Sequence, residues 1–291
     1  MTETIGDIDV TLVPRIYGAS ELGVLSLTAP GASHPRVEYV GGDLFVGLDD
    51  ARDHAALTQG QADALGRPFT EALAASLPDA AGPADAVDGA LVIDDEAVAA
   101  AVLLEPARLP AAGLSGAPVV FALSRQRVVV VGSDDEDAVG RVLDLADELF
   151  EAGGPLVSAH PIVRADEGWA PFPWRERFPS LELRFERILR LFSVRAYDVQ
   201  TAALQRPDVH IAEAKIQVLE SGVTATYAAW PKGTATLLPV VDNVIIADPS
   251  GQLSVATLTQ FLDAAGDAVV RTGLSPARYF VPGDQPRTSE A

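Results

Sequence analysis

Residues 119–150 read VVFALSRQRVVVVGSDDEDAVGRVLDLADELF, and this stretch decides the fold class. Its first part holds two apolar runs, 118–123 and 127–132, which are joined by Ser124-Arg125-Gln126. A connection this short joins antiparallel strands and is too short for a parallel crossover. The stretch therefore predicts a β-hairpin, followed by a helix whose apolar residues recur every three or four positions.

The start of that helix is acidic. Ser133 or Asp134 is predicted to be the N-cap, and the acids at 134–137 complement the positive end of the helix dipole. The same acids could hold a metal ion, but they lack the alternating spacing and central glycine of a calcium loop. They also disfavour a phosphate at this helix start. Capping is predicted, with no metal site.

The pattern of a strand followed by acids occurs twice more upstream. Asp49 and Asp50 follow the run 43–48, and the acids 94–96 follow the run 90–93, each ahead of a helical pattern. A second hairpin signal lies at Gly41-Gly42. Antiparallel strands with helices between them predict an α+β fold, with antiparallel sheets and helices packed on one face.

Composition narrows the function. The chain has 291 residues, a net charge of −20 and no cysteine. The charge disfavours nucleic acid and anionic membranes as partners, and the absence of cysteine excludes disulfides and thiolate chemistry. No stretch approaches the roughly 18 apolar residues of a membrane span, and the first residues do not read as a signal peptide. A cytoplasmic protein without a cofactor is expected.

Two α+β halves are predicted. The expected divisions are an N-terminal domain at 1–163, a Trp/Pro connection at 164–175, a C-terminal domain at 176–282 and a mobile tail at 283–291. In the connection, Trp169, Phe172 and Trp174 alternate with prolines. They would form either an aromatic groove for a peptide or a rigid connection whose rings pack inward.

A long helix is predicted over 176–205, with Arg184, Arg187 and Arg190 on its polar faces. Residues 164–206 hold eight Arg against six acids, which is +2 in a chain of −20. This local excess could attract an acidic partner. The alternative is pairing with acids one turn away on the same helix.

After Pro207 the sequence alternates as strands do, ahead of a helix at 255–271 and a last strand at 277–281. Trp230, Thr234 and Asp242 surround a short loop in this half. The loop is the best place here for a small ligand, although a tight turn between strands explains the same residues.

Turn motifs in both halves carry a family resemblance. They are Gly132-Ser133-Asp134, Pro155-Leu156-Val157-Ser158, Trp169-Ala170-Pro171-Phe172, and the set Trp230, Gly233, Leu237, Leu238, Pro239 and Asp242. Over roughly residues 60–250 the chain resembles the YtpQ-like family of uncharacterised bacterial proteins. The first 60 residues do not match. The resemblance implies a fold and no activity.

Catalytic motifs are absent from the sequence. It contains no G-x-S-x-G, G-x-x-x-x-G-K-[ST], G-x-G-x-x-G or H-E-x-x-H pattern. Ser158 and His160 would share one face of a strand, but nothing nearby supplies an oxyanion hole. No catalytic residue is predicted.

Two functions remain. The favoured one is a non-catalytic interaction or adaptor protein with a protein partner, which predicts an exposed apolar or aromatic patch near Trp169–Trp174 or Trp230. The other is a small-molecule-binding protein or enzyme with a pocket near the Trp230–Asp242 loop. A homo-oligomer is compatible with the sequence, but no pattern in it supports one.

Overall fold

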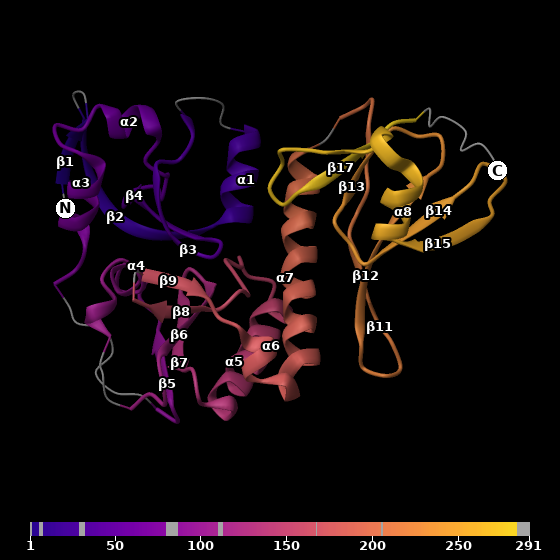
Figure 1. Ribbon diagram of the computed structural model, residues 1–291. Coiled ribbons are helices and arrows are strands. Elements are labelled where there is room, and N and C mark those ends of the chain that lie inside the picture. The colour runs from indigo at the N-terminus through magenta and orange to yellow at the C-terminus, as the bar shows by residue number, and fades with distance from the viewer. Residues whose placement is uncertain are drawn as a thin grey trace. The chain divides into compact units, whose positions relative to one another are not determined.

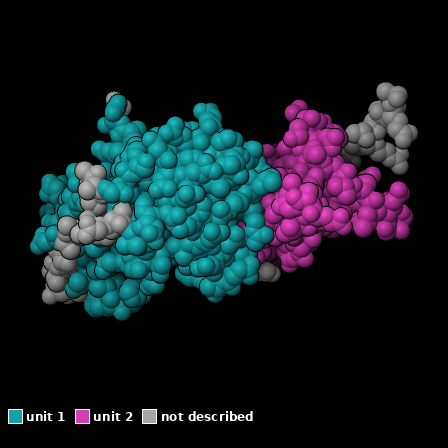
Figure 2. Space-filling model, turned by 90° about the horizontal axis from the view of Figure 1, so that it is seen from below, with its two compact units in different colours: residues 1–188 teal, residues 189–291 magenta. Residues whose placement is uncertain are grey.

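The computed structural model describes residues 2–5, 8–28, 33–79, 87–109, 113–166, 168–204 and 206–283. Side chains are described from Val10 onward. The chain divides into two compact units, residues 1–188 and 189–291 (Figure 2). The division falls inside the long helix α7 (Glu182–Ala203). Of the predicted tail 283–291, all but Gly283 lies outside the described residues.

The first unit begins with an antiparallel four-stranded sheet in the order β1-β2-β4-β3 (Figure 1). Its strands are β1 (Thr2–Ile5), β2 (Ile8–Gly18), β3 (Val37–Gly41) and β4 (Leu44–Asp50). Three helices accompany it: α1 (Ala19–Thr28), α2 (Gln59–Asp63) and α3 (Phe69–Ser76). Thr58 and Gln61 form a capping box that fixes the start of α2.

The second sheet of this unit has five antiparallel strands in the order β5-β7-β6-β8-β9. They are β5 (Ala90–Ile93), β6 (Pro118–Ser124), β7 (Arg127–Gly132), β8 (Ile162–Ala165) and β9 (Gly168–Pro171). The predicted hairpin is confirmed, because β6 and β7 pair around the Arg125-Gln126 turn. The helices are α4 (Glu96–Leu104), α5 (Glu136–Glu151) and the short α6 (Trp174–Arg177).

Capping of α5 is confirmed, but the capping residue differs from the prediction. The side chain of Asp135 accepts a hydrogen bond from the Ala138 backbone N at 2.8 Å. Ser133 instead accepts from the Ala117 backbone N at 3.0 Å, and Asp134 pairs with Arg177. Because Ser133 and Asp134 are held by neighbouring segments, the cap moves one residue along the chain.

The predicted Trp/Pro connection at 164–175 is part of the second sheet. β9 pairs with β8, and β8 pairs with β6, so this segment extends the sheet built on the β6–β7 hairpin. The long helix also begins later than residue 176. Pro179 opens a 3-10 turn, and Phe178 ahead of it is not helical (φ −131°, ψ 67°). A residue before proline avoids the helical region, so α6 and α7 stay separate.

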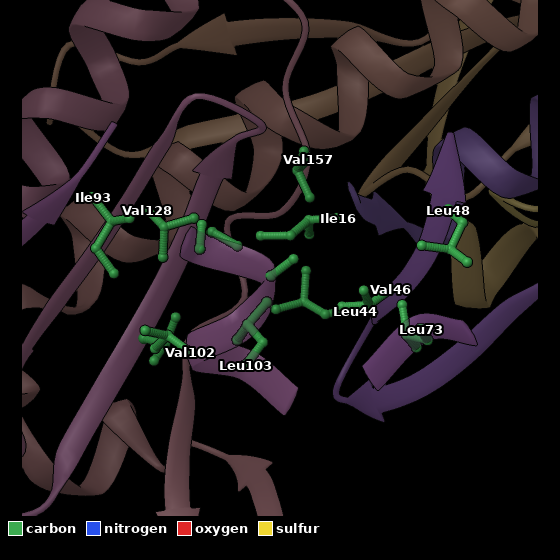
Figure 3. Close-up of a cluster of buried hydrophobic side chains, with 14 of the residues drawn as sticks. Ile16, Leu44, Val46, Leu48, Leu73, Ile93, Val102, Leu103, Val128 and Val157 are labelled. Carbon is green, nitrogen blue, oxygen red and sulfur yellow. The ribbon is translucent and has the colours of Figure 1, made fainter. Parts of the chain in front are cut away.

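One hydrophobic core joins the two sheets of the first unit (Figure 3). Ile16, Leu44 and Val46 approach it from β2 and β4, and Ile93 and Val128 from β5 and β7. Helix α4 lies within this core, since five of its nine residues, Ala99–Leu103, are buried. A helix that is apolar on all sides is stable only when enclosed. Each fully buried Leu, Ile or Val stabilises the fold by about 1.5–3 kcal/mol.

The second unit contains two four-stranded sheets, ordered β10-β13-β17-β16 and β11-β12-β14-β15. The first consists of β10 (His210–Ile211), β13 (Thr236–Pro239), β16 (Val270–Arg271) and β17 (Arg278–Val281). The second consists of β11 (Lys215–Val218), β12 (Thr224–Pro231), β14 (Asn243–Ala247) and β15 (Leu253–Thr257). Helix α8 (Leu258–Ala265) follows β15 and packs Phe261 into the core around Trp230.

The α+β class is confirmed. Both sheets of the second unit are mixed, however, whereas antiparallel sheets were predicted. β10 pairs with β13 in parallel, and so does β12 with β14. Strand β13 leaves for the other sheet, so the chain returns to β14 running in the same direction as β12.

Candidate functional site

Of the two alternatives for the aromatic residues at 169–174, the structure agrees with rings that pack inward and not with a peptide groove. Phe172 and Trp174 are each only 6 % exposed, and the Trp174 ring stacks on Phe185 at 4.5 Å. Trp169 is half-buried against the first unit's core, and its indole N–H donates to the Leu103 carbonyl at 2.8 Å. These rings stabilise the first unit because their large apolar area is removed from water, which would not happen if they lay on the surface.

The Trp230–Asp242 loop is held by its own contacts. Trp230 is buried, and its indole N–H donates to the Thr234 carbonyl at 3.2 Å. Asp242 accepts from the Thr226 backbone N at 2.7 Å and hydroxyl at 2.8 Å, and from Arg190 Nε at 3.0 Å. The structure thus brings Trp230, Thr234, Asp242 and Arg190 together in pairs that fix the loop.

Arg184 and Arg187 pair with helix α5. Arg184 donates to the Gly140 carbonyl at 2.7 Å and to Asp144 at 2.5 Å, and Arg187 lies 3.0 Å from Asp147. Pairing with acids one turn away on their own helix was one of the two explanations considered. The carboxylates come instead from α5, so these two guanidiniums fasten the start of α7 to the first unit.

Ser158 and His160 do not form a nucleophile–base pair. The Ser158 hydroxyl donates to Asp43 at 2.6 Å and accepts from the His160 backbone N at 3.0 Å. Burial raises the pKa of Asp43, although the Ser158 hydrogen bond opposes the rise. The arrangement fastens the segment before β8 to the start of β4.

A cavity of about 470 Å³ lies elsewhere in the first unit, where no site was predicted. The residues around it come from β2, β4, the start of α4, the β6–β7 turn and the end of α5. They are Arg15, Asp49, His54, Glu96, Ser124, Arg125, Gln126, Leu149, Ala152, Gly154, Pro155 and Leu156. The stretch that decides the fold therefore supplies one wall of the cavity, through its turn and its helix.

Arg15 is the centre of the charged wall. Its Nη1 donates to the Asp49 carboxylate and to the His54 carbonyl at 3.2 Å, and its Nη2 donates to Glu21 at 3.0 Å. Its Nε lies 3.7 Å from Glu96 Oε1. The guanidinium also lies over the Tyr17 ring, at 4.7 Å from the centroid. A buried arginine held by so many partners has a fixed orientation.

Strand alternation places this group. Arg15 and Tyr17 are two residues apart on β2, so they lie on the same face, and Gly47 of β4 is opposite Arg15. A Cβ on Gly47 would lie 3.0 Å from the Tyr17 ring, so glycine leaves room for that ring. The Tyr17 hydroxyl donates to the second oxygen of Asp49. Asp49 is 1 % exposed, and each of its two carboxylate oxygens accepts one hydrogen bond, from Arg15 or from Tyr17.

Arg125 contributes the second guanidinium. Its Nη2 donates to Glu21, which is thereby shared between Arg15 and Arg125. The remaining nitrogens of Arg125, Nε and Nη1, have no hydrogen-bond partner among the described residues. The side chain is 29 % exposed. The Nε atoms of Arg15 and Arg125 are both buried without a hydrogen-bond partner in the described part of the chain, so the donor of Arg125 that remains for a ligand is Nη1.

His54 completes the rim with a strained backbone. Its φ is +57°, in the left-handed region that costs a non-glycine residue roughly 1–2 kcal/mol. The conformation is held by the His54 N–H, which donates to the Asp50 carbonyl at 2.9 Å, and by the carbonyl that Arg15 binds. The imidazole is exposed at the cavity edge.

Burial raises the pKa values of the glutamates that contact Arg15. It raises the pKa of Glu21 to about 7, against the opposing effect of Arg15, and it also raises the pKa of Glu96. The folded protein then binds the Glu21 proton more tightly than the unfolded chain, whose glutamate has a pKa of 4.5. The stabilisation from this proton is complete below pH 4.5 and is lost as the pH rises through 7.

We expect the free energy of unfolding to fall between these two pH values by on the order of 2–3 kcal/mol because of Glu21. Replacing Glu21 by Gln should remove that part of the slope. The measurement is urea denaturation of the wild type and of E21Q at a series of pH values. Parallel slopes for the two proteins would show that Glu21 is not the group responsible.

Sequence reasoning missed Arg15, Tyr17, Glu21, His54 and Arg125. It also grouped Asp49 and Glu96 with the acids that begin helices. Asp95 is indeed the N-cap of α4, since it accepts from the Val98 N at 2.9 Å. Asp49, in contrast, lies within β4 and faces the interior. The signal available in the sequence was Arg15, a charged residue inside the largely apolar run that precedes Gly18.

No family model, curated protein or solved structure matches the chain. The resemblance to the YtpQ-like family therefore stays a prediction. Within the described ranges, no helix combines the length and the apolar character that crossing a membrane requires.

Proposed function

We propose that the protein binds a small organic acid in the cavity between Arg15 and Arg125, through the acid's carboxylate. The observation that carries this proposal is that Arg125, partly exposed at a cavity beside a second, rigidly held guanidinium, has no hydrogen-bond partner for its Nη1 among the described residues. Guanidinium and carboxylate match in geometry and form charge-assisted hydrogen bonds. The cavity volume is also in the range typical of small-molecule sites.

The charges around the cavity favour a small monoanion over a phosphate. The first unit has 13 Arg against 31 acids, a net charge of −18. Asp49 and Glu96 add negative charge to the wall itself. A multiply charged anion would meet this repulsion in full, whereas a carboxylate pairs with Arg125 alone. Ser124, Gln126 and His54 offer hydrogen-bonding partners for the rest of the molecule.

Binding, without a chemical step, fits the contacts best. Asp49 is 1 % exposed, and each of its carboxylate oxygens accepts a hydrogen bond from Arg15 or Tyr17, so its role in the structure is to position Arg15. The interaction-protein alternative predicts an exposed apolar or aromatic patch near these tryptophans, and the burial of Phe172, Trp174 and Trp230 favours the binding proposal over it. A cytoplasmic location remains an expectation beside this proposal.

A thermal-shift panel tests the proposal. We expect the monoanions benzoate and lactate to raise the melting temperature, while their neutral amides, benzamide and lactamide, do not. At about 100 times its Kd, a ligand stabilises by ~2.7 kcal/mol, which corresponds to about 5–10 °C. Arg125→Gln should abolish the shift. The matched control is Arg164→Gln, which removes the same charge from an exposed arginine of the same unit.

Two outcomes would contradict the proposal. Equal shifts from the acids and their amides would show that the carboxylate is not recognised. A shift that survives in R125Q and disappears in R164Q would place the binding site elsewhere.

A further inference from the structure

Strand β15 is an edge of its sheet, and no other strand in the described part of the chain pairs with its outer side. It pairs with β14 on one side and ends the order β11-β12-β14-β15 (Figure 1). The hydrogen bonds at the two ends of this pairing come from the Asp248 N to the Gln252 carbonyl and from the Leu258 N to the Asp242 carbonyl, each 3.0 Å. The backbone N–H and C=O groups of the even-numbered residues on this strand therefore point toward β14. The backbone N–H and C=O groups of Leu253 and Val255 point away from it.

The side chains on this edge are apolar and exposed. Leu253 is 65 % exposed and Val255 is 67 % exposed. The register places Val255 beside Ile245 of β14, and Leu253 beside Ala247, so the apolar surface continues onto the sheet. β15 reads LSVAT and contains no charge and no proline. Charged residues and proline are what most proteins place on a free strand edge to prevent it from pairing with another chain.

We propose that two copies of the chain associate through β15, antiparallel across a two-fold axis at Ser254. This register places Leu253 opposite Val255 of the partner subunit. Each copy then offers two N–H and two C=O groups, and all of them find partners in the other copy. The four-stranded sheets of the two copies become one continuous sheet. On one face of that sheet, Leu253 packs against the partner's Val255.

Charge and symmetry select a second copy as the occupant. The second unit has 8 Lys and Arg against 10 acids, a net charge of −2, compared with −18 for the first unit. Two copies that meet through the second unit therefore experience far less repulsion than two that meet through the first. A strand that is complementary to itself in the antiparallel direction forms an isologous contact, which closes at a dimer.

Sedimentation velocity on the full chain tests this proposal. The wild type is expected to form a species of twice 30.5 kDa as its concentration rises. Val255→Lys should remain monomeric, because it places a charge at the centre of the joined sheet. The matched control is Val218→Lys on β11, the opposite edge of the same sheet, where the valine is 56 % exposed. Far-UV circular dichroism confirms that both variants fold.

Crosslinking tests the register independently of stability. The chain has no cysteine, so Ser254→Cys introduces a single thiol. At a non-hydrogen-bonded antiparallel pair the two Cα atoms lie about 4.5 Å apart, within the range of a disulfide. Mild oxidation should convert S254C into a covalent dimer and leave Val218→Cys monomeric. A wild type that stays monomeric at its solubility limit, or a dimer that V255K leaves intact, would overturn the proposal.

Discussion

Replacing Asp49 by Ala is expected to lower the free energy of unfolding of the first unit by about 3–5 kcal/mol. Asp49 is 1 % exposed and accepts hydrogen bonds from both Arg15 and Tyr17. The substitution leaves a buried guanidinium without its main counter-charge and a buried hydroxyl without its acceptor. A buried charge that loses its partner costs far more than the pair contributes when intact.

The adjacent Asp50 provides the control for this experiment. Asp50 pairs with Arg52, whose side chain is 57 % exposed, and it has no contact with Arg15. Asp50→Ala removes the same charge one residue away and should have a much smaller effect. Urea denaturation measures both, and hydrogen exchange of the β2 and β4 amides assigns the loss to the first unit. Equal losses in D49A and D50A would contradict the role given to Asp49.

Replacing Arg278 by Ala is expected to destabilise the second unit by about 3–5 kcal/mol. Arg278 is fully buried, and every one of its N–H groups donates a hydrogen bond. The acceptors are Gln200 Oε1 at 2.6 Å, the Ala212, Leu237 and Tyr197 carbonyls at 2.7, 3.1 and 3.5 Å, and the Thr201 hydroxyl at 2.7 Å. No carboxylate in the described part of the chain pairs with it.

Burial without a carboxylate lowers the pKa of Arg278 to about 10, so the side chain remains charged at neutral pH. Removing the guanidinium leaves several buried acceptors unsatisfied and opens a cavity. Arg271→Ala is the matched control, because Arg271 lies on the neighbouring strand β16 and is exposed. Thermal denaturation of both variants measures the effect. A melting temperature of R278A equal to that of R271A would show that this network does not hold the unit together.

Local patterns were sufficient for the fold class. The short link at Ser124–Gln126 required a hairpin, and acids at two helix starts act as caps, at Asp95 and Asp135. These features depend on residues a few positions apart, so one sequence is enough to find them. The exchange of β13 into a second sheet has no such local signature, and the parallel pairing of β12 with β14 was therefore not predicted.

The candidate site depends on distant residues, and sequence patterns could not assemble it. Arg15 and Asp49 are 34 positions apart, and Glu21 and Arg125 are 104 apart. Asp49 follows an apolar run as a capping acid does, and only its tertiary contacts reveal a buried partner of Arg15. The aromatics of 169–174 were ambiguous for a similar reason, since exposed and buried tryptophans beside prolines look alike in sequence.

The most direct test of the central claim is a calorimetric titration with benzoate of the wild type, R125Q and R164Q. If the Arg15–Arg125 cavity binds a carboxylate, the wild type and R164Q will bind one equivalent with the same affinity. R125Q will bind at least about tenfold more weakly, because a hydrogen bond to a charged group contributes about 1.5–3 kcal/mol. Equal affinity in R125Q and the wild type, or no heat of binding from any acid of the panel, would contradict the claim.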